Sequence, residues 1–475
     1  MDAKLVDLGF ESIDYIALAT FLFEATGEWL DISKISSETR IADISSYLIA
    51  PAVEKPPHKK MVKLDNWQRH VYSNQLKDEH AGYVSCIIHY LCLKEHIDLS
   101  RLKCAIEETL NNHFALNSKL IRIVDDYYFE RTRTQIDFTF KGSFLFPKKD
   151  HAKLIIGVHS DRLVNIYTQR KNKQYYLIIS FQHIALDGWS YTIIQEEIFR
   201  RYAGLYERRK MSESEEICAL NRVYAASLIE PSNPRELASI FELIDPYQYN
   251  KLDRLFNGKL QFHYNCFVIK KENIDQYAMK NSINDFSYDV IFSFMYYQMI
   301  SELFTIDSVL IYITLSNRYL PIASIKELVA NLATGLPLFM NNKSTGSRDF
   351  ATEINDILRV YFKHMSFGAI TRILLEKNTL LNTFLSPLKR PYCFKLTYIN
   401  NTSKIVYGND SIVGRYVNLS ESTTDICLDE RKQVFIIIHN MGSDFIIELY
   451  SRMAKGFHNK MVNDFFKMQF QIEDS

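Results

Sequence analysis

The segment Ser180–Ser190, SFQHIALDGWS, constrains the fold of this chain more than any other. The apolar run before it predicts a strand over 174–181, and the pattern after it predicts a helix over 190–209. The strand therefore ends close to His183, and the turn that follows contains Asp187. Such a chain must place a histidine and a carboxylate at one end of a sheet, beside the N–H groups of a helix start.

These residue types suit proton chemistry. Histidine is the side chain whose pKa lies nearest neutrality, and a helix start can stabilise a developing oxyanion. Gly188 allows the backbone of the turn to approach a neighbouring group closely. Taken alone, such a pattern more often holds a structural histidine than a catalytic base, so the role of His183 depends on the rest of the chain.

Helices and strands are mixed along the whole chain, which indicates an α/β (α+β) fold. The charged segment 205–235 is expected at the surface, between two halves of similar size. Further strands are predicted at 153–168, 262–269, 308–314, 392–399, 433–439 and 443–449, and further helices at 99–113, 272–281, 288–304, 349–365 and 450–469.

Composition excludes several classes of function. Lys plus Arg and Asp plus Glu both total 56, so the net charge of +0 argues against nucleic-acid binding and against a polybasic membrane anchor. No apolar run is long enough for a membrane span, and the N-terminus does not resemble a signal peptide, so a cytoplasmic protein is expected. The seven cysteines form no CxxC pair and no HExxH motif occurs, so no metal site is predicted.

The segment 180–190 resembles the HHxxxDG motif of the condensation domains of nonribosomal peptide synthetases, which belong to the chloramphenicol-acetyltransferase-like superfamily. Here the motif begins with Gln182 in place of the first histidine, retains His183, Asp187 and Gly188, and continues with the family-like Trp189 and Ser190. Similar stretches occur in the family's order at 64–68 (LDNWQ), 97–120, 289–318 (ending TLSNR), 329–338 (VANLATGLPL) and 392–400.

The resemblance implies two chloramphenicol-acetyltransferase-like lobes, residues 62–235 and 236–475, arranged in a V around a central tunnel. It implies that His183 is the catalytic residue, acting as a base or holding the nucleophile in position, and that Asp187 is structural and pairs with Arg318. Gly188 would let the backbone approach the substrate thioester. The family's charged residues near 112–117 are replaced here by Asn112, Phe114 and Asn117, so we expect altered packing there.

Residues 1–50 precede a linker at 51–61, which is rich in proline and lysine. Leu8–Ile13 (LGFESI) resembles the carrier-protein motif in which a 4'-phosphopantetheine arm is attached to the serine, here Ser12. A helix start suits a phosphodiester, although a serine there is more often only an N-cap. Only eleven residues precede Ser12, so we expect a partial, helical carrier-like fragment.

The function implied is the transfer of an acyl or peptidyl group from a carrier-bound phosphopantetheine thioester to an amine or alcohol. Carrier proteins of a nonribosomal peptide or polyketide synthetase are the expected partners. Because no further domain follows, the acceptor is expected on a separate carrier or as a free small molecule. The alternatives are an acyltransferase that uses acyl-CoA and a catalytically degenerate docking or scaffold module. Epimerization and heterocyclization relatives are disfavoured, the latter because they replace the histidine pair with an aspartate pattern that is absent here.

Overall fold

The computed structural model describes the larger part of the chain. The described residues are scattered positions between 3 and 49, then 61–65, 68–69, 86–93, 97–124, 126–132, 156, 160–171, 174–206, 211–227, 260–306, 308–316, 318, 322, 324–341, 346–363, 392–399, 414–416, 432–454 and 459–470.

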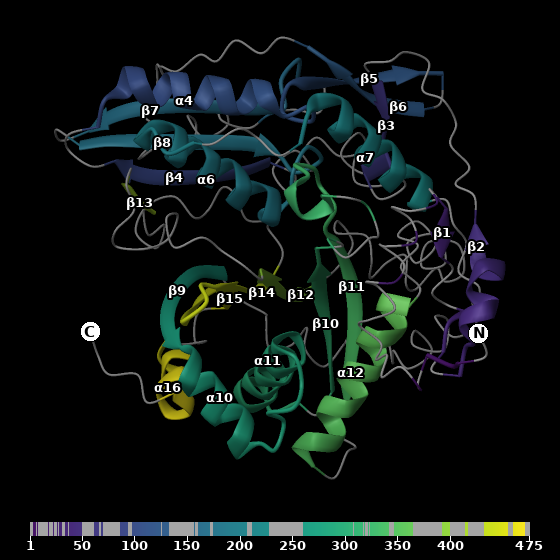
Figure 1. Cartoon of the computed structure of the whole chain (residues 1–475). Coiled ribbons are helices and arrows are strands. Elements are labelled where there is room, and N and C mark those ends of the chain that lie inside the picture. The colour runs from purple at the N-terminus through teal and green to yellow at the C-terminus, as the bar shows by residue number, and fades with distance from the viewer. Residues whose placement is uncertain are drawn as a thin grey trace.

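A four-stranded sheet forms the framework of the first half (Figure 1). Helices α4 (Leu99–Asn112) and α6 (Gly188–Ala203) cover one face of this sheet, because alternate residues of its strands are apolar and point toward them. The strand order is β13-β4-β8-β7, with bounds Gly414–Tyr416, Cys86–Leu93, Gln174–Gln182 and Val164–Lys171.

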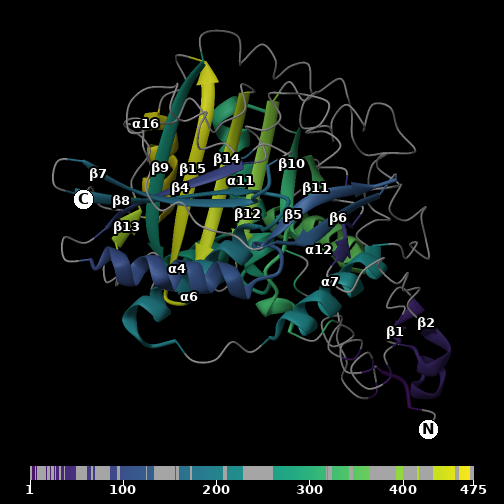
Figure 2. The same ribbon diagram turned by 90° about the horizontal axis from the view of Figure 1, so that it is seen from above.

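A six-stranded mixed sheet forms the second half. Strands β10, β12 and β14 are parallel to one another, and the remaining pairs are antiparallel. The strand order is β11-β10-β12-β14-β15-β9, with bounds Thr334–Asn341, Ser308–Leu315, Tyr392–Ile399, Lys432–Asn440, Asp444–Ala454 and Leu260–Lys270. The strands of the first sheet cross over it when the molecule is seen from above (Figure 2).

Helices bury one face of this second sheet. They are α10 (Lys271–Lys280), α11 (Tyr288–Phe304), α12 (Ser347–Lys363) and α16 (Asn459–Phe470). Helix α11 is the most buried of them, since apolar side chains surround it on nearly all sides. Within the described ranges, no helix combines the length and the apolar character needed to cross a membrane.

A small three-stranded sheet, in the order β3-β6-β5, lies beside helix α7 (Glu213–Ser227). Its strands are Met61–Lys63, Asp126–Arg131 and Ser118–Ile123. The prediction of a surface segment over 205–235 was wrong for α7, because Ala219, Leu220 and Val223 are buried in a core cluster. Its other charged residues are more exposed, while Glu216 is buried, so charge content alone concealed an amphipathic helix.

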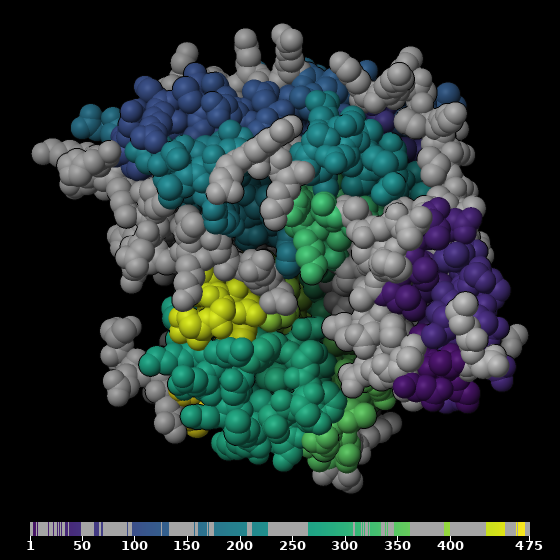
Figure 3. Space-filling view, viewed as in Figure 1, coloured from purple at the N-terminus to yellow at the C-terminus, as the bar shows by residue number. Residues whose placement is uncertain are grey.

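Two segments from late in the chain are built into the first half. Strand β13 pairs with β4, and residues 325–332 contribute apolar side chains to a core shared with Leu64 and Ile184. Figure 3 shows the first half, in blue and teal, above the second half, in green and yellow. The predicted lobe boundary at 235/236 and the central tunnel stay predictions.

Three predicted elements differ from the structure. The final helix begins at Asn459 and not at 450, because β15 continues to Ala454 and stays paired with β9 along its length. Strand β7 begins at Val164, whereas 160–163 are not in a strand. Residues Trp29–Leu30, within the fragment expected to be helical, form strand β1, which pairs with β2 (Leu48–Ile49).

The described part of residues 1–50 also contains a 3-10 helix over Ile41–Tyr47. Its small core is formed by Leu5, Leu30, Ile35 and Ile44. Ser12 and its LGFESI motif lie outside the described residues, as do residues 51–60 of the predicted linker. Met61, the last residue of that linker, is buried and begins β3.

Candidate active site

His183 lies in the turn that follows β8, and its ring orientation is fixed by the backbone. Nδ1 lies 2.9 Å from the carbonyl oxygen of Leu186. A carbonyl can only accept a hydrogen bond, so Nδ1 carries the proton and donates it. Nε2 then keeps its lone pair. This is the tautomer that a general base requires.

The surroundings of His183 favour its neutral form. Burial lowers the pKa of the imidazole, and the ammonium of Lys395 lowers it further. The Leu186 carbonyl and the Asp187 carboxylate partly oppose this effect. Both lowering causes act against the charged imidazolium, so His183 is an uncharged proton acceptor at neutral pH.

Asp187 joins the turn to the start of α6. It is the N-cap of the helix, and its Oδ1 accepts a hydrogen bond of 2.8 Å from the backbone N–H of Ser190. Its Oδ2 accepts another of 3.0 Å from the N–H of Leu332. Arg318 Nη2 lies 2.9 and 3.1 Å from the two carboxylate oxygens. The carboxylate is 1% exposed, so this ion pair is almost fully buried.

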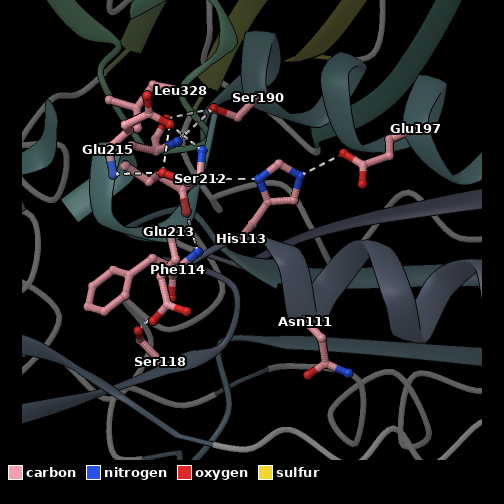
Figure 4. Close-up of polar contacts among 12 residues, drawn as sticks. Asn111, His113, Phe114, Ser118, Ser190, Glu197, Ser212, Glu213, Glu215 and Leu328 are labelled. Carbon is pink, nitrogen blue, oxygen red and sulfur yellow. Dashed lines mark hydrogen bonds and ion pairs between the residues drawn. The ribbon is translucent and has the colours of Figure 1, made fainter. Parts of the chain in front are cut away.

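Arg318 pairs with Asp187, as the resemblance implied. It also binds the loop 325–330 to the start of α6. Its guanidinium donates to the carbonyl oxygens of Ile325 at 3.0 Å and Ala330 at 3.1 Å, and also to that of Leu328. Ser190 Oγ accepts from Arg318 at 2.8 Å and donates to Ala330 at 2.7 Å. Figure 4 shows Ser190 and Leu328 close together at this junction.

Gly188 and Trp189 contact segments that are distant in sequence. A Cβ atom placed on Gly188 would lie 3.2 Å from Cδ1 of Ile399, the last residue of β12. The glycine therefore permits a close approach between the start of α6 and the second sheet. The indole of Trp189 donates a hydrogen bond of 2.9 Å to the carbonyl of Lys326.

Gln182, which replaces the first motif histidine, is fully buried. Its Nε2 donates to the carbonyl of Ile156, and its Oε1 has no hydrogen-bond partner among the described residues. The amide group of Gln182, which is next to His183 in the chain, is therefore held by Ile156.

The opening motif also reaches this turn. Asp65 and Gln68 exchange hydrogen bonds, since each side chain accepts from the backbone N–H of the other. Gln68 Nε2 then donates to the carbonyl of Ile184 at 3.4 Å. The LDNWQ stretch therefore supports the turn that contains His183, a role that its position in the sequence alone did not reveal.

A buried charged network behind the site was missed by the sequence analysis. His113 Nε2 lies 2.9 Å from Glu197 of α6, and Nδ1 lies 3.3 Å from Glu216 of α7. Figure 4 shows the imidazole of His113 bonded to Glu197. Glu197 also accepts two hydrogen bonds from Arg201, of 3.1 and 2.9 Å. Because both ring nitrogens face carboxylates, the contacts fit an imidazolium.

The same network includes the segment 112–117, where altered packing was expected. Phe114 and Asn117 are both buried, and the backbone N–H of Phe114 donates to Glu216 at 2.6 Å. The carboxylate at this position is Glu216 of α7. Sequence reasoning could have found this only by noticing an acidic residue on the buried face of the 213–227 helix.

His439 is the other histidine with a carboxylate contact among the residues that the structure describes. His439, predicted to be structural, is 3% exposed and lies 3.1 Å from Glu448 on the neighbouring strand. His159 lies outside the described residues, and so does the side chain of His89. No group of three potential ligands that could hold a metal ion occurs in the part of the chain that the structure describes.

Comparisons with known proteins agree with the geometry. Residues 58–217, which include the His183 turn, match the model of the condensation domain family. No curated protein matches the sequence. The fold is the chloramphenicol-acetyltransferase-like fold of condensation domains, since solved structures of that kind superimpose on most of the chain.

Three solved structures illustrate the similarity. The epimerization domain from the third module of tyrocidine synthetase B has a TM-score of 0.58 and 11% identity, and the match covers 88% of this chain and 97% of that one. The first condensation domain of the CDA synthetase has a TM-score of 0.57 and 11% identity, with coverages of 86% and 96%. The EpoB cyclization-docking bidomain from Sorangium cellulosum has a TM-score of 0.60 and 13% identity, with coverages of 89% and 87%.

Proposed function

We propose that this chain is a condensation enzyme of the nonribosomal-peptide-synthetase type. It transfers an acyl or peptidyl group from a thioester on a carrier protein's phosphopantetheine arm to an amine or an alcohol. The observation that carries the proposal is the His183 imidazole, whose Nδ1–H is held by Leu186 so that Nε2 is a lone-pair donor. The family match over 58–217 supports the same reading.

His183 accepts the proton of the attacking nucleophile or orients it, and a positioned base of this kind contributes about 10² to 10⁴ in rate. Asp187 and Arg318 do not take part in proton transfer. They hold the turn and the start of α6 in one geometry, because their buried ion pair joins three backbone segments. Gly188 keeps the turn free of a side chain where the backbone approaches its neighbours.

The donor arm is borne by a partner carrier protein, and the acceptor is an amine or alcohol on a second carrier or a free small molecule. A phosphopantetheine arm on Ser12 would make residues 1–50 an additional donor carrier. The support for that arm is the LGFESI motif, since Ser12 lies outside the described residues.

The decisive experiment compares wild type with His183→Ala and His183→Gln, using an acyl-loaded carrier and a panel of amines and alcohols. Product is measured by mass spectrometry. We expect product with the wild type and a loss of about 10² to 10⁴ in rate for both variants. Equal thermal unfolding of the three proteins excludes misfolding. Unchanged rates in the variants would refute the role of His183.

The same assay separates the two rival functions. An acyltransferase that uses acyl-CoA directly would convert acyl-CoA to product at least as fast as it converts the carrier-bound thioester. A docking or scaffold module would bind the carrier and form no product with either donor.

Attachment to Ser12 is tested by intact-protein mass spectrometry after treatment with a phosphopantetheinyl transferase and CoA. The expected result is a mass gain of one phosphopantetheine arm, absent in Ser12→Ala. No mass gain in the wild type would exclude the carrier role of this fragment and leave the role of His183 untouched.

A further inference from the structure

Three neighbouring strands of the second sheet are tied to the His183 turn at one end. Arg318, which follows β10, binds both carboxylate oxygens of Asp187. The N–H of Leu332, just before β11, donates to the same carboxylate at 3.0 Å. Ile399, at the end of β12, lies against Gly188, since its Cδ1 is 3.2 Å from the position that a Cβ would take there. Side chains just inside this end of the sheet therefore lie close to the turn, beneath the first half of the chain (Figure 1).

Two threonines lie at this end of the sheet, on the face opposite its helices. On β12, Phe394 and Leu396 belong to the core on the helix side, so Thr397 and Ile399 lie on the other face. Thr397 is two residues from Ile399, which is about 7 Å along the strand. Thr314 of β10 is the register partner of Thr397 and therefore shares its face.

The two hydroxyl groups form a polar pair that can bind a further group. Thr397 Oγ1 donates to Thr314 Oγ1 at 3.0 Å. A hydroxyl has one hydrogen and two lone pairs, so the hydrogen of Thr314 and lone pairs on both oxygens remain. Among the residues that the structure describes, none accepts that hydrogen. Both threonines are half-buried, and the neighbour of Thr314 on β11 is Gly335, which has no side chain to cover the pair.

The pair presents one donor and one acceptor side by side, and this arrangement fits an amide-bearing chain. In an extended chain, the N–H and the C=O of one residue point to the same side. The hydrogen of Thr314 suits such a carbonyl oxygen, and a lone pair of Thr397 suits the N–H. A hydrocarbon chain makes neither bond. Cross-strand threonine pairs also stabilise sheets, but a purely structural pair would affect unfolding and leave ligand affinity unchanged.

We propose that Thr314 and Thr397 form a substrate subsite that binds an amide-bearing segment of the thioester donor. This inference rests on the proposed function and names the chemistry that the second sheet recognises. Two parts of a donor have this chemistry, namely the phosphopantetheine arm itself and an aminoacyl or peptidyl group attached to it. A segment held at this end of the sheet fixes the direction of the donor chain, so that its thioester carbonyl is presented to the turn that contains His183.

The test uses unreactive thioether analogues of acyl-pantetheine. One carries a hydrocarbon acyl group, and the other carries an N-acetylglycyl group, which adds an amide to the acyl chain. The variants are Thr314→Val and Thr397→Val, which keep the shape of the side chain and remove the hydroxyl, and Thr397→Ser, which keeps the hydroxyl. The matched control is Thr352→Val, since the Thr352 hydroxyl donates within α12, on the helix side of the sheet, at 2.9 Å. Affinity is measured by calorimetry and stability by thermal unfolding.

We expect each of the first two valine variants to bind the N-acetylglycyl analogue roughly 3- to 10-fold more weakly than wild type, which is the effect of losing one hydrogen bond. Thr397→Ser and Thr352→Val should match wild type. A loss confined to the N-acetylglycyl analogue assigns the subsite to the aminoacyl or peptidyl group. An equal loss with both analogues assigns it to the arm.

Wild-type affinity of Thr314→Val and Thr397→Val for both analogues overturns the inference, and a lower unfolding temperature in that case gives the pair a structural role only. Failure of the wild type to bind either analogue also overturns it. The proposed function is judged separately. If the wild type binds the analogues but forms no product from a loaded carrier, or if His183→Ala is fully active, the proposed function has failed, while the affinities still decide the role of the threonine pair.

Discussion

The buried network around Glu197 allows a quantitative prediction about stability. Burial by itself would raise the pKa of this carboxyl group, but the hydrogen bonds and positive charges of His113 and Arg201 lower it to about 2. The substitution Glu197→Gln keeps the size of the side chain and removes its charge. His113 and Arg201 then remain beneath the protein surface without the carboxylate that faces both of them.

The magnitude follows from the shift of the pKa. A carboxyl group that moves from 4.5 to about 2 on folding contributes roughly 3 kcal/mol to stability. Loss of one partner of a buried ion pair costs a similar amount, about 3 to 5 kcal/mol. Because the pKa is lower in the folded state, this contribution is complete above pH 4.5 and is lost as the pH falls toward 2.

The assay is equilibrium unfolding by denaturant at several pH values between 3 and 8. Glu196→Gln is the matched control, since Glu196 is the adjacent residue and forms a largely exposed pair with Arg200. We expect Glu197→Gln to lose roughly 3 kcal/mol at pH 7 and progressively less below pH 4.5, whereas the control changes by less than about 1 kcal/mol. Equal effects of the two substitutions, or a Glu197→Gln effect independent of pH, would refute the reasoning.

Two further predictions concern the His183 turn, and a third concerns the hairpin between β14 and β15. Arg318→Met leaves the Asp187 carboxylate buried without a cation, so we expect a loss of about 3 to 5 kcal/mol in denaturant unfolding, and a loss below 1 kcal/mol would contradict the buried pair. Gly188→Ala places a Cβ 3.2 Å from Ile399, so we expect a lower kcat/KM that the added substitution Ile399→Val restores. A failure of the double variant to recover would locate the cause elsewhere. Gly442 has a φ of 88° in open space, so Gly442→Ala should cost about 1 kcal/mol of unfolding free energy, and no change would show that the loop adapts.

The site was predictable from the sequence where its residues are adjacent in the chain. His183, Asp187 and Gly188 lie within one short turn, so the strand before them and the helix after them define their relative positions. Arg318 was predicted only through the resemblance to a known family, since 131 residues separate it from Asp187. Nothing in its local sequence distinguishes a buried arginine from one at the surface.

The elements that were predicted wrongly share a physical cause. Strand β15 continues to Ala454 because β9 supplies hydrogen-bond partners along its whole length, and the sequence of β15 alone does not reveal that partner. Helix α7 contains several charged residues, yet one of them, Glu216, is buried because His113 lies opposite it. In both cases a contact from elsewhere in the chain decided the outcome.

Acyl-transfer chemistry was expected from the family resemblance alone. The sequence by itself determined the mixed α/β class and the strand, turn and helix around His183. These features depend on periodicity and on residues that are close in sequence. Only the tertiary structure decided which carboxylates surround His113 and that Arg318 is buried against Asp187. Those are relations between side chains on different elements. They depend on how the two sheets lie against each other, which local patterns do not specify.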